Sequence, residues 1–230
     1  MSEPRAPFLG WAGWSIFGEA CGLGTLQTLW WIVVYMGADW LTGLRTTRVR
    51  IHLDAELGMP FVPAMILVYR SIDVMFLAAP FILRSRAEIR GLTLTLALVT
   101  AIAGVGFLLL PAEVAYPPQD PGIWAPLYAW NRHIVLTYNM VPSLHVALSV
   151  ATLSAYGRRR GNVGKGLLLG WGTAITLSTL LTHQHHLLDV VTGLLLGGAG
   201  HVLVYRRFLE RRQAERSVPA SPSTDAAPPV

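Results

Sequence analysis

Two histidine-containing motifs in the sequence carry the residue types that could do chemistry. His185 and Asp189 are four residues apart, so on a helix they would share one face. A carboxylate at that spacing can accept the N–H of one ring nitrogen, which fixes the tautomer and leaves the other nitrogen a lone pair for attack. The neighbouring His183 and His186 would point elsewhere. The pair predicts a histidine nucleophile oriented by an aspartate; the alternative is a group of interfacial polar residues at a helix end.

The second motif, Asn-Met-Val-Pro-Ser-Leu-His at residues 139–145, is typical of the start of a helix. Pro142 fits a first helical turn, where its missing N–H is not needed. The free N–H groups and the positive dipole end of a helix N-terminus suit a phosphate group, to which Asn139 and the Ser143 hydroxyl could add contacts. His145 lies in the first turn and could protonate a leaving oxygen. Alone, this motif would indicate only a helix start.

The composition indicates a membrane protein. Hydrophobic residues make up 53% of the 230 positions and charged residues only 13%, whereas soluble domains are about a quarter charged. The net charge of +5 raises the question of nucleic-acid binding, but the arginines cluster at the ends of apolar runs, as in membrane proteins. We therefore expect no nucleic-acid partner. The single cysteine, Cys21, excludes an intramolecular disulfide and a multi-cysteine zinc site.

The elements that must position the two motifs are apolar segments, and a membrane span needs about 20 such residues. The sequence predicts an all-α, polytopic membrane domain over residues 1–212 with about six spans, and a Ser-, Pro- and Ala-rich disordered tail over residues 213–230. Residues 8–20 are apolar but contain Glu19, and could lie along the membrane interface. The predicted spans are 24–41, 59–83, 91–110, 142–157 (short for a span), 163–181 and about 184–205.

Arginine and lysine set the expected orientation, because they favour cytoplasmic loops. Most of them lie near the N-terminus, after the second and fourth spans, and after the sixth span. We therefore expect the protein in the cell membrane, with both termini in the cytoplasm. The loops after the first, third and fifth spans are then outside, and both histidine motifs lie at the outer face. An ionisable His–Asp pair at a span end is usually functional.

Together the motifs resemble a known family. Pro-Ser-Leu-His at 142–145 and His-x-x-x-Asp at 185–189 are similar to the second and third signature motifs of the type 2 phosphatidic acid phosphatase superfamily. The extended forms at 138–147 and 185–193, with Met-Pro-Phe-Val-Pro at 59–63 and Pro-Ala-Glu at 111–113, most resemble the branch that contains fungal inositol phosphorylceramide synthases. The resemblance covers roughly residues 50–200.

This resemblance implies an integral membrane phosphatase or phosphotransferase that acts on a lipid phosphate or phosphodiester through a phosphohistidine. His185 would attack phosphorus, Asp189 would orient it, and His145 would protonate the departing alcohol and then activate water or an acceptor hydroxyl. No metal or cofactor is required. The implied partners are the bilayer and a lipid phosphate substrate; the lipid, the choice between hydrolysis and transfer, and the oligomeric state stay open.

The chain departs from the superfamily pattern at its cations. The usual opening motif, Lys followed after six residues by Arg-Pro, is missing, and Ser178-Thr179 stands where Ser-Arg usually precedes the third motif. The transferase branch tolerates this loss better. A phosphoryl group still needs positive charge or many N–H donors. The outer side offers Arg132 and the group Arg45, Arg48 and Arg50. These last three are candidate substrate-binding residues, unless Asp54 and Glu56 pair with them.

Two other functions are compatible with parts of the sequence. His183, His185 and His186 suggest a metal-dependent membrane hydroxylase, but such enzymes need repeated histidine clusters and the remaining histidines are scattered. Arg70 and Asp73, three apart within the second predicted span, suggest a transporter in which they line a path. We expect instead that these two neutralise each other within the helix bundle.

Overall fold

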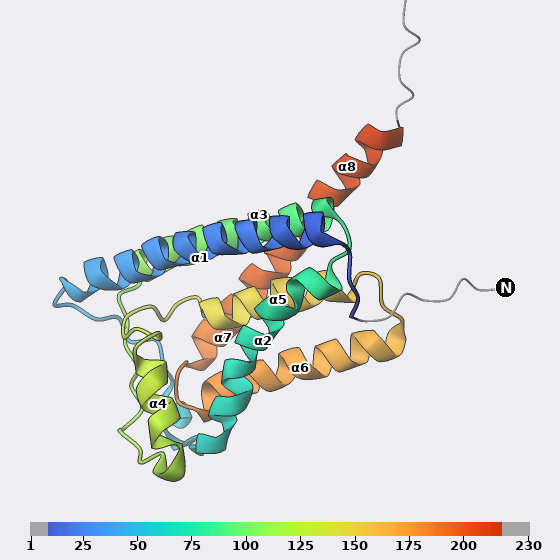
Figure 1. Cartoon of the computed structure of the whole chain (residues 1–230). Helices are drawn as coiled ribbons and strands as arrows, with labels where there is room; N and C mark the ends of the chain where they lie inside the picture. Colours follow the sequence, from blue (N-terminus) through green and yellow to red (C-terminus); the bar gives the residue numbers. More distant parts are fainter. Residues whose placement is uncertain (1–8, 218–230) are drawn as a thin grey trace, which may run out of the picture.

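The computed structural model describes residues 9–217, which form helices joined by loops (Figure 1). The short helical turns are η1 (Asp54–Gly58), η2 (Pro63–Met65) and η3 (Gly122–Trp124), and a π-helical segment, η4 (Gly200–Arg206), joins the last two helices. The longer helices are α1 (Trp14–Gly43), α2 (Ile66–Ile82), α3 (Arg86–Leu109), α4 (Ala125–Arg132), α5 (Leu144–Gly157), α6 (Asn162–Leu181), α7 (Leu187–Ala199) and α8 (Arg207–Ser217).

Helix α5 lies at the centre of the bundle and packs against α2, α3, α6 and α7, while α1 lies along α3. In Figure 1, α1, α2, α3, α5, α6 and α7 alternate in direction, so the loops after α1, α3 and α6 gather at the end that carries α4. Both histidine motifs lie in these loops or at the helix starts that follow them. The chain order therefore brings them to one end of the molecule.

Close packing between α5 and α7 requires two glycines. A Cβ atom on Gly193 would lie 2.6 Å from the carbonyl oxygen of Ser143, and one on Gly197 would lie 2.4 Å from that of Ala147. Both distances are shorter than any real Cβ contact, so side chains here would push the two helices apart. The glycines thus allow the starts of α5 and α7, which carry the two motifs, to approach each other.

The outward surface of the bundle is strongly apolar. Helix α3 exposes large apolar side chains at positions three or four apart, which is one helical face. An apolar surface of this extent marks an interaction with a membrane or a protein. Within residues 9–217, three helical stretches are long and apolar enough to cross a membrane: Pro63–Ile82, Arg86–Leu109 and Leu187–Ser217; Leu144–Gly157 is a shorter apolar helix. The α3 face consists of Leu94, Leu98, Ile102, Val105 and Leu109.

The predicted helices are present, with differences in their bounds. Residues 14–20 belong to α1 and continue directly into the first predicted span. Helix α5 has 14 residues, which is about 21 Å of helix against a hydrocarbon core of about 30 Å. Helices α1 and α6 cover predicted spans but are not among the three stretches above. Their Gly, Thr and charged residues lower their mean hydropathy.

The boundary of the C-terminal tail was predicted too early. Helix α8 continues through Ser217, five residues into the segment expected to be disordered. The physical reason is local, because Gln213 and Ala214 are good helix formers and Arg212 pairs with Glu215 at 3.2 Å. The remainder of the predicted tail, residues 218–230, lies outside the described residues.

Candidate active site

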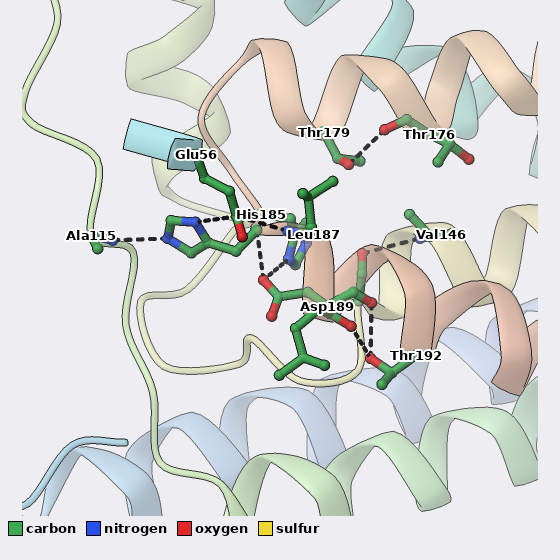
Figure 2. Close-up of polar contacts among 12 residues, drawn as sticks. Glu56, Ala115, Val146, Thr176, Thr179, His185, Leu187, Asp189 and Thr192 are labelled. Carbon is green, nitrogen blue, oxygen red and sulfur yellow. Dashed lines mark hydrogen bonds and ion pairs between the residues drawn. The ribbon is translucent and has the colours of Figure 1, made fainter. Parts of the chain in front are cut away.

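His185 and Asp189 are in contact, but not in the way that the helical spacing predicts. The His185 Nδ1 atom lies 3.3 Å from Asp189 Oδ2, and both side chains are buried. Helix α7 begins only at Leu187, so His185 precedes the helix instead of sharing a face with Asp189. Asp189 lies in the first turn and reaches back, where Oδ2 also accepts the His186 backbone N–H at 2.9 Å (Figure 2). A helix-capping carboxylate therefore also orients the histidine.

The backbone of His185 is held from the other side by Thr179. The Thr179 carbonyl accepts the N–H groups of Gln184 at 3.0 Å and of His185 at 3.1 Å. Thr179 occupies the position where the phosphatase superfamily that the motifs resemble usually has arginine, and its side chain is buried and donates to the Thr176 carbonyl at 2.8 Å. In this chain the position therefore fixes the turn before α7, and it contributes no positive charge.

His145 is fixed by the backbone of α2. Its Nε2 atom lies 2.9 Å from the Tyr69 carbonyl oxygen, and its ring stacks on the Tyr69 ring with centroids 3.9 Å apart. A carbonyl oxygen only accepts hydrogen bonds, so Nε2 carries the proton of this bond. Proton exchange with a substrate would therefore use Nδ1. By the same reasoning, Asp189 holds the Nδ1–H of His185 and leaves Nε2 as its free nitrogen.

Ser143 and Asn139, the other two predicted site residues of the 139–145 motif, have structural partners. Ser143 is buried and caps α5, since its Oγ accepts the Val146 N–H at 3.3 Å. Its own N–H donates to the Asp189 carbonyl at 2.9 Å, which ties the two motifs together. Asn139 donates through Nδ2 to the Tyr35 carbonyl at 2.6 Å. Its buried Oδ1 atom has no hydrogen-bond partner within residues 9–217.

A cavity of about 940 Å³ brings both motifs together. His145, His185 and Asn139 line it, and so do apolar side chains of α1, α2 and α3. The lining follows α2 from Tyr69 to Leu83, which is about 20 Å at the helical rise. Its volume is near the upper end of the usual range for ligand sites, about 300–1,000 Å³. The site is thus the polar end of a long, mainly apolar cavity.

Arg70 is the one arginine that lines this cavity, as far as the described residues show. Its Nη2 atom lies 2.5 Å from Asp73, and its guanidinium lies 4.3 Å from the centre of the Trp130 ring. The Nη1 atom donates to Asn131 at 3.5 Å, while the buried Nε atom has no partner within residues 9–217. The predicted pair with Asp73 is therefore present, but it leaves one donor unused. A charge within an apolar helix is the sequence signal that could have identified it.

The three arginines predicted from the sequence lie elsewhere. Arg45 donates to the Leu108 carbonyl at 2.5 Å, and Arg50 pairs with Asp54. Arg48 donates to the Arg45 carbonyl at 2.6 Å and lies over the Tyr138 ring at 4.2 Å. These side chains bind loop carbonyls, a carboxylate and an aromatic ring, and none of the three lines the cavity.

A second cluster, not anticipated from the sequence, lies beside the site. Buried Glu56 contacts the His186 ring, and Tyr116 stacks between His183 and His186 with centroid distances of 4.0 and 4.5 Å. Burial opposes ionisation of Glu56, but the N–H groups of Leu187 and Leu53 and the His186 ring outweigh it and lower its pKa. Burial, Glu56 and Asp189 raise the pKa of Tyr116 to about 12.

His183, His185 and His186 therefore do not converge on one point. His183 binds the Met59 carbonyl at 3.1 Å, and no group of three His, Cys, Asp or Glu side chains within residues 9–217 is arranged to hold a metal ion. No protein-family model, no curated protein and no solved structure matches the chain.

Proposed function

We propose that the chain is a polytopic membrane phosphatase or phosphotransferase that cleaves a lipid phosphate or phosphodiester through a phosphohistidine on His185. One observation carries the proposal. His145 and His185 line the same cavity, and each has one ring nitrogen fixed by a neighbouring acceptor. A pair of oriented imidazoles at one cavity suits nucleophilic attack by one ring and proton transfer by the other.

In the first step, the lone pair of His185 Nε2 forms a bond to phosphorus as the bond to the leaving alcohol oxygen breaks. His145 gives that oxygen a proton. In the second step, water or an acceptor hydroxyl attacks the phosphohistidine and gives its proton to His145, and the N–P bond breaks. Asp189 stabilises the positive ring of His185 in both steps, as an orienting carboxylate does.

Arg70 is our candidate for the cation that binds the phosphoryl group. Preorganised positive charge near the developing oxyanion is usually a large part of catalysis. Arg70 lines the cavity and has an unused Nε donor, whereas Arg45, Arg48 and Arg50 have other partners. Its Nε atom is buried, so we assign the contact with the substrate to the guanidinium as a whole, whose charge the ion pair with Asp73 partly offsets.

The apolar length of the cavity supports a lipid substrate. One leaflet of the hydrocarbon core is about 15 Å thick, and the cavity follows α2 for about 20 Å. A hydrocarbon chain would lie between α1, α2 and α3 while its phosphate lies at the histidines. We assign the site to the outer membrane face, since basic residues lie at the other end of the bundle, where Arg159 pairs with Glu88 at 2.8 Å.

A substrate screen of detergent-purified protein tests this function. Free phosphate and new phospholipid products would be measured side by side for lipid phosphates and phosphodiesters, with His185→Ala as the matched control. We expect turnover in the wild type and none in the variant. Equal turnover by the two proteins would contradict the proposal.

Cysteine labelling tests the orientation. With Cys21 removed, single cysteines in the loop at 117–122 should react with an impermeant thiol reagent in intact cells, and cysteines at 158–165 should not. The reverse pattern would place the chemistry in the cytoplasm.

A further inference from the structure

The carboxylate of Glu56 holds the start of α7 although it lies in a distant part of the chain. Its Oε2 atom accepts the Leu187 N–H at 2.9 Å and the His186 Nδ1–H at 3.1 Å (Figure 2). Its Oε1 atom accepts the Leu53 N–H at 3.0 Å. Only 2% of the residue is exposed. A buried carboxylate with three N–H donors is held in its ionised form, because those donors favour the charge.

The His186 ring is bound at both nitrogens. Its Nε2 atom accepts the Ala115 N–H at 3.1 Å, so this nitrogen carries a lone pair and Nδ1 carries the proton that Glu56 accepts. The ring is completely buried and therefore joins two loops, one after α1 and one after α3. Neither Glu56 nor His186 lines the cavity, so neither touches a substrate there.

The link to the reaction is the peptide that His186 shares with His185. The His186 N–H donates to Asp189 Oδ2, the same oxygen that binds His185 Nδ1. A shift of His186 therefore displaces the neighbouring His185 and also removes a donor that fixes Asp189. Supporting hydrogen bonds of this kind control the geometry of the groups that react.

We propose that Glu56 and His186 form a positioning pair that aims His185 Nε2 into the cavity. The inference rests on the proposed function for its kinetic consequence, but its geometric consequence is independent of it. The pair makes the placement of His185 depend on the loop after α1, which carries Glu56, and on the loop after α3, which carries Ala115. A displacement of about 1 Å at a reacting group costs about 10²-fold in rate, so small changes in the pair should be measurable.

Steady-state kinetics separates positioning from simple stabilisation. Glu56→Gln keeps the shape of the side chain but replaces one acceptor oxygen by an N–H₂ donor, so either the Leu53 N–H or both the Leu187 and His186 N–H groups lose their acceptor. We expect kcat of the folded protein to fall about 10²-fold with KM unchanged, because the cavity lining is intact. Asp54→Asn, an exposed carboxylate on the same short helix, should keep kcat. An unchanged kcat in Glu56→Gln, with only the melting temperature lowered, would contradict the inference.

Two variants of His186 separate its hydrogen bonds. Asparagine places an amide N–H near the position of Nδ1 and can still donate to Glu56, whereas glutamine can accept from Ala115 but loses the Glu56 bond. We expect His186→Asn to retain more activity than His186→Gln. The double variant Glu56→Gln/His186→Gln should be no slower than the slower single variant, because residues that act as one unit are not additive. Additive losses would contradict a shared role.

A spectroscopic measurement needs no substrate and so distinguishes failure of this inference from failure of the proposed function. In detergent-solubilised protein with ¹⁵N-labelled histidine, His186 should show a proton on Nδ1 and none on Nε2. Glu56→Gln should move the imidazole ¹⁵N resonances of His185, whereas Asp54→Asn should not. Unmoved His185 resonances would overturn the positioning role even in an active enzyme. Moved resonances in a protein without turnover would support it and count against the proposed function alone.

Discussion

The two sides of the turn between α6 and α7 hold histidines in different environments. On the cavity side, His145 and His185 each have one ring nitrogen bound by the protein, and both residues line the cavity. On the loop-covered side, His186 is bound at both nitrogens and stacks on Tyr116. His185 and His186 are neighbours in the chain. Residue type alone therefore does not separate the histidines that we propose to react from His183 and His186; the difference is that only the former line the cavity.

The largest effect should come from the cavity side. His185→Ala and His145→Ala should each reduce turnover to background, since loss of a nucleophile or its proton-transfer partner costs about 10⁶-fold in kcat in a comparable triad. Phosphate release by purified, folded protein is the measurement. His183→Ala is the comparison, because His183 stacks on Tyr116 and binds a backbone carbonyl. A His183 variant as inactive as His185→Ala would remove the distinction between the two sides.

Asp189→Asn should have the next largest effect. An amide can still accept a hydrogen bond from the His185 ring, but it cannot stabilise the imidazolium charge, and it can select the wrong tautomer. The corresponding change in a serine protease costs about 10⁴-fold, and we expect a smaller loss here. Single-turnover phosphoenzyme formation is the measurement. A loss as large as that of His185→Ala would contradict a purely orienting role for Asp189.

The arginines extend the comparison to binding. Arg70→Gln should reduce kcat/KM by about 10²–10³-fold, the usual cost of removing one donor to a developing oxyanion. Arg48→Gln should have little effect, because Arg48 lies over the Tyr138 ring outside the cavity. Inhibition by inorganic phosphate is a direct check, since it should weaken in the first variant alone. The opposite ranking would move the phosphate site to the loop after α1.

The smallest effect concerns stability against pH on the loop-covered side. The pKa of Glu56 lies below its ordinary value of 4.5, so ionised Glu56 stabilises the fold above that pH. The contribution is lost as the pH falls through the lowered pKa. Glu56→Gln should therefore be less stable than the wild type at neutral pH, and its stability should fall less steeply below about pH 4.5. Denaturant unfolding in detergent between pH 3 and 7 measures both. Parallel curves would contradict an ionised Glu56.

Much of the helix layout could be predicted from the sequence, because apolar segments separated by arginine-rich loops define it. The structure supplies three candidate membrane spans and helices over the other predicted segments. The contact between His185 and Asp189 was also anticipated. Its backbone geometry was not, since the spacing of four residues arises here from a helix cap and the residues before it.

The parts that could not be predicted depend on contacts between residues far apart in the chain. Glu56 is one of the acidic residues in the loop after α1, and proximity in sequence suggested Arg45, Arg48 or Arg50 as its partner. Its actual partner, His186, is 130 positions away. The sequence also predicted that Arg70 and Asp73 pair, but it could not indicate that Arg70 lines the cavity beside the histidines.

The central proposal, that His185 is the nucleophile, is tested most directly by trapping the phosphoenzyme. His145→Ala, mixed with a substrate that has a good leaving group, should still form a phosphoenzyme because the leaving oxygen then needs no proton. Rapid denaturation at alkaline pH and peptide mass spectrometry would locate the phosphate. We predict phosphate on His185 in this variant and none in His185→Ala. Phosphate on His145 in the His185→Ala protein, or wild-type turnover by that protein, would contradict the mechanism.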